Sequence, residues 1–228
     1  MRTNPVKGEL RRVMYDLLGH ALEAVGITGN RLEPLTDRGD GVLVLIRPHD
    51  DVPKTVLLDR LVPLLATLLA EYNAQAAQPA LRIRLRAVLH AGEVHMDKRG
   101  PYGEAIDVAI RLLDSPAAKR ALKKTAEPLA LVVSDELYSG IVTHGYTTGD
   151  AYRPLVRVSV ANRWRRGWVR IPAPPAPPAA AAASLTPDGQ PADAPRAAQL
   201  AIADERVEQR VAALAGRGSV TRAGPVAG

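Results

Sequence analysis

The most informative part of this chain is Thr36-Asp37-Arg38-Gly39-Asp40-Gly41, which is followed by the apolar run Val42-Leu43-Val44-Leu45-Ile46. Asp-Gly beside apolar residues is typical of a β-hairpin turn. A glycine on each side of Asp40 leaves the backbone free to present that carboxylate, which is a ligand that divalent cations prefer. Asp40 is therefore a candidate metal ligand, and a plain turn residue is the alternative.

Composition limits the class of protein. The chain has 228 residues, a formal net charge of +6 and no cysteine, which excludes disulfides, thiolate metal sites and cysteine nucleophiles. No apolar stretch is long enough to span a membrane, and residues 1–5 lead into an amphipathic pattern without a signal-peptide core. We expect a soluble, cytoplasmic protein without a membrane partner. The alternating Arg82, Arg84 and Arg86 are typical of protected strand edges, so nucleic-acid binding is disfavoured.

The chain divides into three parts. Residues 1–171 have the periodicities of a folded domain, and residues 172–198 form a linker of mostly proline and alanine. In residues 199–228, Leu200, Val207, Val211 and Leu214 recur near helical spacing before a glycine-rich end. A helix of that length is marginal alone in water, so we expect a short possible helix and a disordered tail.

Helical and strand patterns alternate within residues 1–171. Apolar residues from Leu10 to Val25 follow helical spacing and end at Gly26, a residue suited to a helix C-terminus. The sequence then predicts the hairpin at Asp40, a helix over 53–73, a strand over 81–96 broken at Ala91-Gly92, helices over 103–113 and 116–124, a strand over 128–133, a helix over 134–142, and paired strands over 154–161 and 167–171 that turn at residues 165–167. These elements predict an α+β fold in which an antiparallel sheet carries helices on one face.

Several phrases in this order resemble the catalytic domain of class III nucleotidyl cyclases, and in particular an actinobacterial group of cyclase-homology proteins. They are Arg2-Thr3-Asn4-Pro5, the Asp40 hairpin, Leu89-His90-Ala91-Gly92-Glu93-Val94-His95, Ala105 to Asp114, and Ser134-Asp135-Glu136-Leu137-Tyr138. The resemblance covers about residues 2–171 and implies a ferredoxin-like sheet. The first strand of that fold, which carries an aspartate, is missing because the chain starts too late to contain it.

The resemblance also implies a mechanism. Cyclases of this class are dimers with sites between two subunits, where two aspartates hold two Mg²⁺ or Mn²⁺ ions that polarise a nucleoside triphosphate and help deprotonate the ribose 3′-hydroxyl. Asp40 matches the second metal aspartate. One carboxylate cannot hold both cations tightly, and Asp37, three residues before the tip, is more suited to capping the turn.

The positions that contact the transferring phosphoryl group are only partly retained. By resemblance, Arg111 keeps the stabilising arginine, whereas Asp107 stands where the family has an asparagine. An acid at that position repels a triphosphate unless it pairs with Arg111 one helical turn away.

The positions that read the base and hold the phosphates also differ. Thr36 and Gly100 replace the lysine and aspartate that select the purine, and Ala161 replaces a phosphate-binding lysine. Arg163 is close enough in sequence to compensate for that lysine, and a solvated hairpin arginine is the alternative.

Two other residue pairs attract attention. His90 and His95 suggest a metal pair, but an offset of five along a strand favours opposite faces, so we expect a buried, hydrogen-bonded His90 and an exposed His95. Trp164 and Trp168 are expected to be packing residues.

Three functions remain open. The first is a degenerate, non-catalytic cyclase-homology domain that forms a homodimer or heterodimer, acts in signalling or regulation, and retains a nucleotide site. The second is an active cyclase, if the true N-terminus lies upstream of Met1. The third is a protein that binds nucleic acid or an acidic partner through its basic hairpin.

Overall fold

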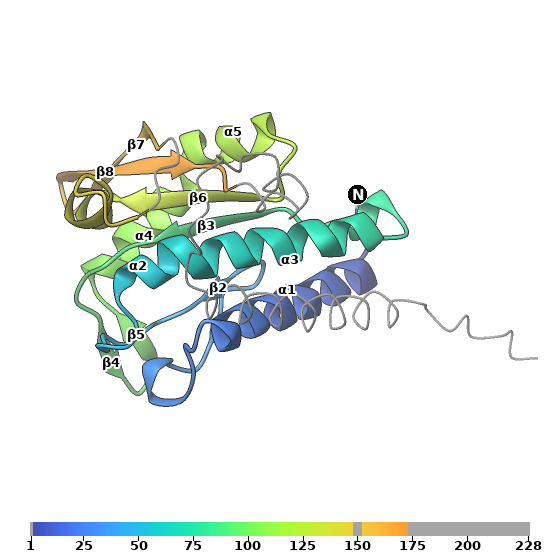
Figure 1. The fold of residues 1–228 in the computed structure, drawn as a ribbon, viewed down its shortest axis with the longest axis horizontal. Helices are drawn as coiled ribbons and strands as arrows, with labels where there is room; N and C mark the ends of the chain where they lie inside the picture. The colour runs from blue at the N-terminus through green and yellow to red at the C-terminus, as the bar shows by residue number, and fades with distance from the viewer. Residues whose placement is uncertain (1, 148–151, 173–228) are drawn as a thin grey trace, which may run out of the picture.

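The structure is a computed structural model that describes residues 2–147 and 152–172 (Figure 1). It has an α+β fold, as the sequence predicts. Beyond Pro172, the predicted linker and the predicted C-terminal helix and tail lie outside the described residues. The main helices are α1 (Asn4–Ala24), α3 (Val62–Gln75), α4 (Glu104–Asp114) and α5 (Pro116–Lys124). The strands are β1 (Thr36–Asp37), β2 (Val42–Leu43), β3 (Leu85–Leu89), β4 (His95–Asp97), β5 (Gly100–Tyr102), β6 (Leu129–Ser134), β7 (Arg153–Val160) and β8 (Arg163–Arg170).

The two long N-terminal helical segments have the predicted positions. Helix α1 has Pro5 in its first turn and is followed by Gly26 at φ +79°, the left-handed conformation that terminates many helices. The predicted helix over 53–73 is observed as α2 (Lys54–Val56), a π-helical segment η2 (Leu57–Leu61) and α3 in direct succession. Three short segments complete the description: the 3₁₀ turns η1 (Gly29–Arg31) and η3 (Pro79–Leu81), and α6 (Asp135–Leu137), which continues into the π-helical η4 (Tyr138–Val142).

The main sheet is mixed, which corrects the antiparallel prediction. Its strand order is β3-β6-β8-β7, with β3 parallel to β6 and the other two pairs antiparallel. The parallel pair follows from the connection, because α4 and α5 return the chain to the end of the sheet from which β3 started. The hairpins β1-β2 and β4-β5 form separate two-stranded sheets.

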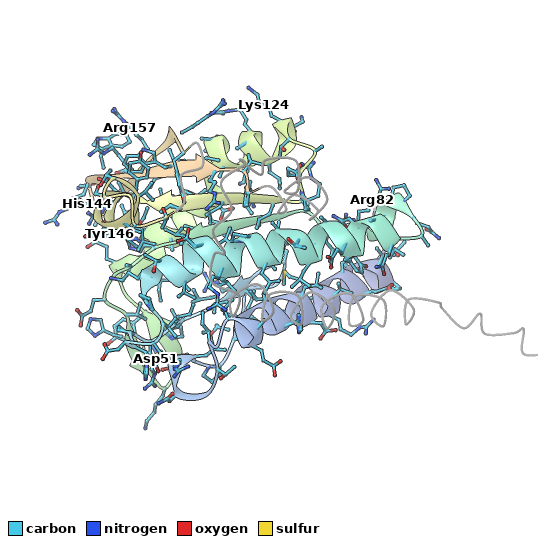
Figure 2. All side chains as sticks on the ribbon, in the orientation of Figure 1. Asp51, Arg82, Lys124, His144, Tyr146 and Arg157 are labelled. Carbon is cyan, nitrogen blue, oxygen red and sulfur yellow. The ribbon has the colours of Figure 1, made fainter. Side chains whose placement is uncertain are left out.

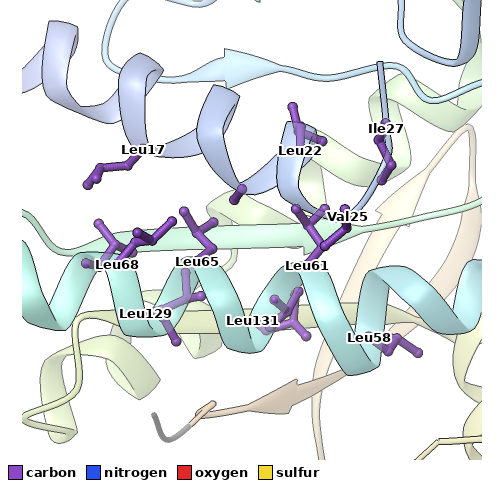
Figure 3. Close-up of a cluster of buried hydrophobic side chains, with 14 of the residues drawn as sticks. Leu17, Leu22, Val25, Ile27, Leu58, Leu61, Leu65, Leu68, Leu129 and Leu131 are labelled. Atoms are coloured by element: carbon purple, nitrogen blue, oxygen red, sulfur yellow. The ribbon is translucent and has the colours of Figure 1, made fainter. Parts of the chain in front are cut away.

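Helices cover both faces of the sheet, whereas the sequence predicted helices on one face. Strand β6 is buried along its whole length. Its Leu129 and Leu131 contact the core formed with α1 and α3, and its Val132 contacts the core formed with α4 and α5. Figure 3 shows Leu17 and Leu65 in the first of these cores. The prediction was wrong because the amphipathic stripe of α4 and α5 does not reveal which face of a sheet it covers.

The predicted long strand over 81–96 is observed as a shorter strand. Only Leu85–Leu89 forms β3, so the strand ends two residues before the predicted break at Ala91-Gly92. Before β3, the side chain of Asn73 binds both backbone groups of Ile83 at 2.7 Å, which replaces strand pairing there. After the break, His95–Asp97 pairs with Gly100–Tyr102 in a separate hairpin.

The last hairpin turns at Ala161-Asn162, not at residues 165–167 as predicted. Ala161 and Asn162 both have positive φ (46° and 59°), the conformation that a tight two-residue hairpin turn requires. Gly167 instead lies within β8, where an added Cβ would come within 3.1 Å of Leu112 and Val132. This glycine is therefore a close-packing residue and not a turn residue.

Candidate functional site

Asp40 lies at the tip of the β1-β2 hairpin. Thr36 pairs with Leu43 and Asp37 with Val42, and the Arg38 amide donates to the Gly41 carbonyl at 2.9 Å, which leaves Gly39 and Asp40 as the turn. Gly39 has φ +80°, so this turn needs the glycine. The hairpin prediction is confirmed, and the Asp40 side chain is exposed.

Asp37 fixes the turn from its base, as the sequence predicts. Its carboxylate accepts hydrogen bonds from the Gly39 amide (3.1 Å) and the Tyr15 hydroxyl (3.2 Å), and it pairs with Arg11 of α1 at 2.6 Å. The Arg11 hydrogen bond is the largest of the causes that hold the pKa of Asp37 below its ordinary value. The hairpin is thereby tied to α1, and Asp37 is not available as a second metal ligand.

Asp107 and Arg111 lie together on α4. Gly103 precedes this helix at φ +141°, where an added Cβ would come within 3.1 Å of the Glu93 carbonyl, so the start of α4 depends on a glycine. One helical turn separates Asp107 from Arg111, and both side chains are exposed. They make no hydrogen bond or ion pair with each other in the described part of the chain. The pairing that would neutralise Asp107 is therefore not formed.

These two residues line an open cavity of about 300 Å³ with the turn of the last hairpin. The other lining residues are Ile110 of α4 and Ser159, Val160 and Ala161. The cavity therefore joins three of the positions that the resemblance assigns to phosphate contacts: Asp107, Arg111 and Ala161. Arg163 follows the same turn, is exposed, and pairs in register with Val160.

An ion pair joins the start of α4 to strand β8. Arg165 donates to the Glu104 carboxylate, and this bond is the main cause that lowers the pKa of Glu104 below its ordinary value. Alternation along β8 puts Arg163 on the same face of the hairpin as Arg165, the face that meets α4 through Glu104. No local sequence pattern indicates this pair, because its partners lie sixty-one residues apart and meet only through the fold.

Asp40 does not meet the cavity within one chain. Its hairpin is tied to α1, which belongs to the core on one face of the sheet, whereas α4 packs on the other face. The proposed base-selecting positions are also separate: half-buried Thr36 lies in the β1-β2 sheet and Gly100 in the β4-β5 sheet, at φ +124°. Within a single chain Asp40 and the cavity residues therefore form two separate groups, and Gly100 belongs to a third sheet.

The predicted burial of His90 and exposure of His95 are confirmed, but the predicted hydrogen bond of His90 is not, because its Nδ1 has no hydrogen-bond partner among the described residues. The His90 side chain is only 8% exposed, and its Nδ1 lies 3.3 Å from Glu136 Oε2, while His95 is exposed. Burial is the main cause that lowers the pKa of His90. No group of three or more histidine, aspartate or glutamate side chains that could hold a metal occurs among residues 2–147 and 152–172.

The tryptophans follow the prediction only in part. Trp168 stacks on Tyr138 with ring centroids 4.0 Å apart, whereas Trp164 is 74% exposed and is not a packing residue. Both rings share one face of β8, so the difference arises because Tyr138 covers Trp168 and does not reach Trp164.

No helix among the described residues is both long enough and apolar enough to cross a membrane.

Comparisons of the chain with family models, curated proteins and solved structures found no match.

Proposed function

We propose that this chain is a degenerate nucleotidyl cyclase-homology domain that forms a dimer and binds a nucleoside triphosphate with Mg²⁺ or Mn²⁺ without converting it to a cyclic nucleotide. Such a domain would act as a regulatory module whose dimer is stabilised by its ligand. The proposed homology rests on the sequence phrases, since no family match supports it.

One observation carries the proposal. Asp107 and Arg111 lie one turn apart on α4, and the turn at Ala161 is about fifty residues further along the chain, yet all three line the same 300 Å³ cavity. The resemblance assigns all three to the phosphates. A cavity of this size at the edge of α4 can admit part of a triphosphate, with the Arg111 guanidinium as a charged donor to its oxygens.

The dimer is supported by the separation of the two groups of site residues. Asp40 is held on the α1 side of the sheet and Arg111 on the α4 side. Two copies related by a two-fold axis could bring Asp40 of one copy to the cavity of the other, which forms two equivalent sites.

The proposed loss of turnover rests on Asp107. Its carboxylate faces the cavity one turn from Arg111 and has no counter-ion among the described residues. A negative charge beside a triphosphate opposes the further charge that develops during phosphoryl transfer. A ligand that reaches this site therefore needs the cation at Asp40 for neutralisation.

The test is titration of the full chain with ATP and with GTP, with and without Mn²⁺, followed by an assay for cyclic nucleotide. We expect binding that requires the metal and yields no cyclic product. Arg111→Ala should weaken binding about tenfold or more, because it removes a charged hydrogen bond. Arg120→Ala, which removes an exposed arginine of the neighbouring helix α5, is the matched control and should bind normally. Absence of binding would overturn the proposal, and cyclic product would replace it with the active-cyclase alternative.

A further inference from the structure

The positive charge of the chain is concentrated in its last hairpin. Residues 153–170 contain six arginines and no acidic residue. This equals the whole formal net charge of +6, so basic and acidic residues balance in the rest of the chain. Concentration of this kind is the electrostatic mark of a surface that binds a polyanion.

The hairpin projects past the sheet that supports it. Strand β8 pairs with β6 only from Gly167 to Arg170, whereas its pairing with β7 continues to Arg163 and Val160. Residues 157–166 therefore form a two-stranded ribbon that extends beyond β6. This ribbon, including its turn at Ala161-Asn162, is called the arginine ribbon below.

One face of the arginine ribbon carries an exposed aromatic ring between arginines. Side chains alternate along β8, so Trp164 and Arg166 share a face, and their cross-strand partners Ser159 and Arg157 share it too. Trp164 is 74% exposed, although a ring of this size is normally well covered. Figure 2 places Tyr146, which is 67% exposed, at the same end of the molecule as Arg157.

The arginines of the ribbon differ in their partners. Arg165 is bound to Glu104, and Arg166 lies 3.3 Å from Asp135. Arg157 and Arg163 are exposed and make no hydrogen bond or ion pair within the described residues. Arg157 also stands directly across the ribbon from Arg166, and Asp135 pairs only with Arg166, so the Arg157 charge has no counter-ion among the described residues.

We propose that the arginine ribbon binds single-stranded nucleic acid, with Trp164 stacked on a base, Arg157 contacting a phosphate on the same face, and Arg163 contacting a phosphate from the opposite face beside the turn. An acidic peptide would satisfy the arginines but would leave the Trp164 ring without a flat partner. A base offers a π-face of matching size, and stacking of this kind tolerates any sequence. The Trp164 stacking surface is separate from the cavity beside α4, because Trp164 lies on the other face of the ribbon from Val160, whereas Arg163 lies on the Val160 face.

The test measures binding of the full chain to a fluorescein-labelled deoxythymidine 15-mer and to the corresponding uridine 15-mer. We expect Trp164 fluorescence to be quenched on binding, and the logarithm of the affinity to fall with the logarithm of salt concentration with a slope of about −2, as two or three phosphate contacts require. Trp164→Ala should weaken binding about tenfold, and Trp164→Phe should restore part of it because a smaller ring still stacks.

Two double variants distinguish binding at the arginine ribbon from general electrostatic attraction to the chain. Arg157→Gln with Arg163→Gln should reduce both the affinity and the salt slope. Arg82→Gln with Lys124→Gln removes the same charge from exposed positions far from Arg157 in Figure 2 and should leave binding nearly unchanged. The proposal is overturned if the unaltered chain does not bind at low salt, if Trp164→Ala binds normally, or if polyglutamate competes as well as the oligonucleotides do.

Discussion

At the scale of single residues, His90 shows what a sequence can and cannot predict. Its burial follows from its place at the end of an apolar strand, and that prediction is confirmed. Its neighbours could not be predicted. Glu136 lies after β6 and Arg165 lies on β8, so both come near His90 only because β6 stands between β3 and β8. Contacts made by strand order are not encoded in any local pattern.

This environment makes stability depend on pH. Burial, with a further contribution from the Arg165 charge, lowers the pKa of His90 in the folded state, and the attraction of Glu136 offsets them only partly. The unfolded chain therefore binds the His90 proton more readily than the folded chain does. Stability should be complete above the ordinary histidine pKa of about 6.5 and fall as the pH drops toward the folded value.

Thermal unfolding between pH 7 and pH 5 measures this effect. His90→Gln should flatten the decrease in melting temperature over this range, because the titrating group is removed. The exposed His95→Gln should keep the decrease of the unaltered chain. If the two variants show the same pH dependence, protonation of His90 does not limit the stability of the fold.

At the scale of elements, the long amphipathic segments were predicted well and the sheet was not. Helices α4 and α5 begin within one residue of the predicted bounds, since their apolar spacing and their glycine and serine starts are local signals. The last hairpin was misplaced because Gly167 suggested a turn, whereas the actual turn uses Ala161 and Asn162. The direction of β3 relative to β6 is set by the crossover, and no single-strand pattern contains it.

The role of Gly167 gives a test of β8 packing. Gly167→Ala would place a methyl group within 3.1 Å of Leu112 and Val132 and 3.3 Å of the Val133 carbonyl. It should lower the free energy of unfolding by about 1–3 kcal/mol, the usual cost of overpacking a core. Gly8→Ala, at an exposed site in α1 with no atom near the added methyl, should raise it by about 0.5–1 kcal/mol. Urea unfolding of both variants gives the comparison, and similar effects of the same sign would contradict the packing assigned to Gly167.

At the scale of the whole molecule, the fold separates Asp40 from the cavity beside α4. Asp40 lies on the side of α1, and the cavity at Asp107 and Arg111 lies on the side of α4. The sequence indicated which residues to examine, because hairpin and helix motifs are local. It could not show that they fall on opposite faces of one sheet, since that depends on where the crossover helices pack. The need for a second copy is therefore an inference from the fold.

The most direct test of this account is complementation between two variants that each bind nucleotide weakly. Asp40→Ala and Arg111→Ala are co-expressed with different affinity tags, and the mixed dimer is purified through both tags. Each parent should bind Mn²⁺ nucleotide weakly, because every site lacks one group. The mixed dimer has one intact site and one doubly altered site, so it should bind about one nucleotide per dimer with the affinity of the unaltered protein. A mixed dimer that binds no better than its parents, or a chain that stays monomeric at all concentrations, would contradict the shared site.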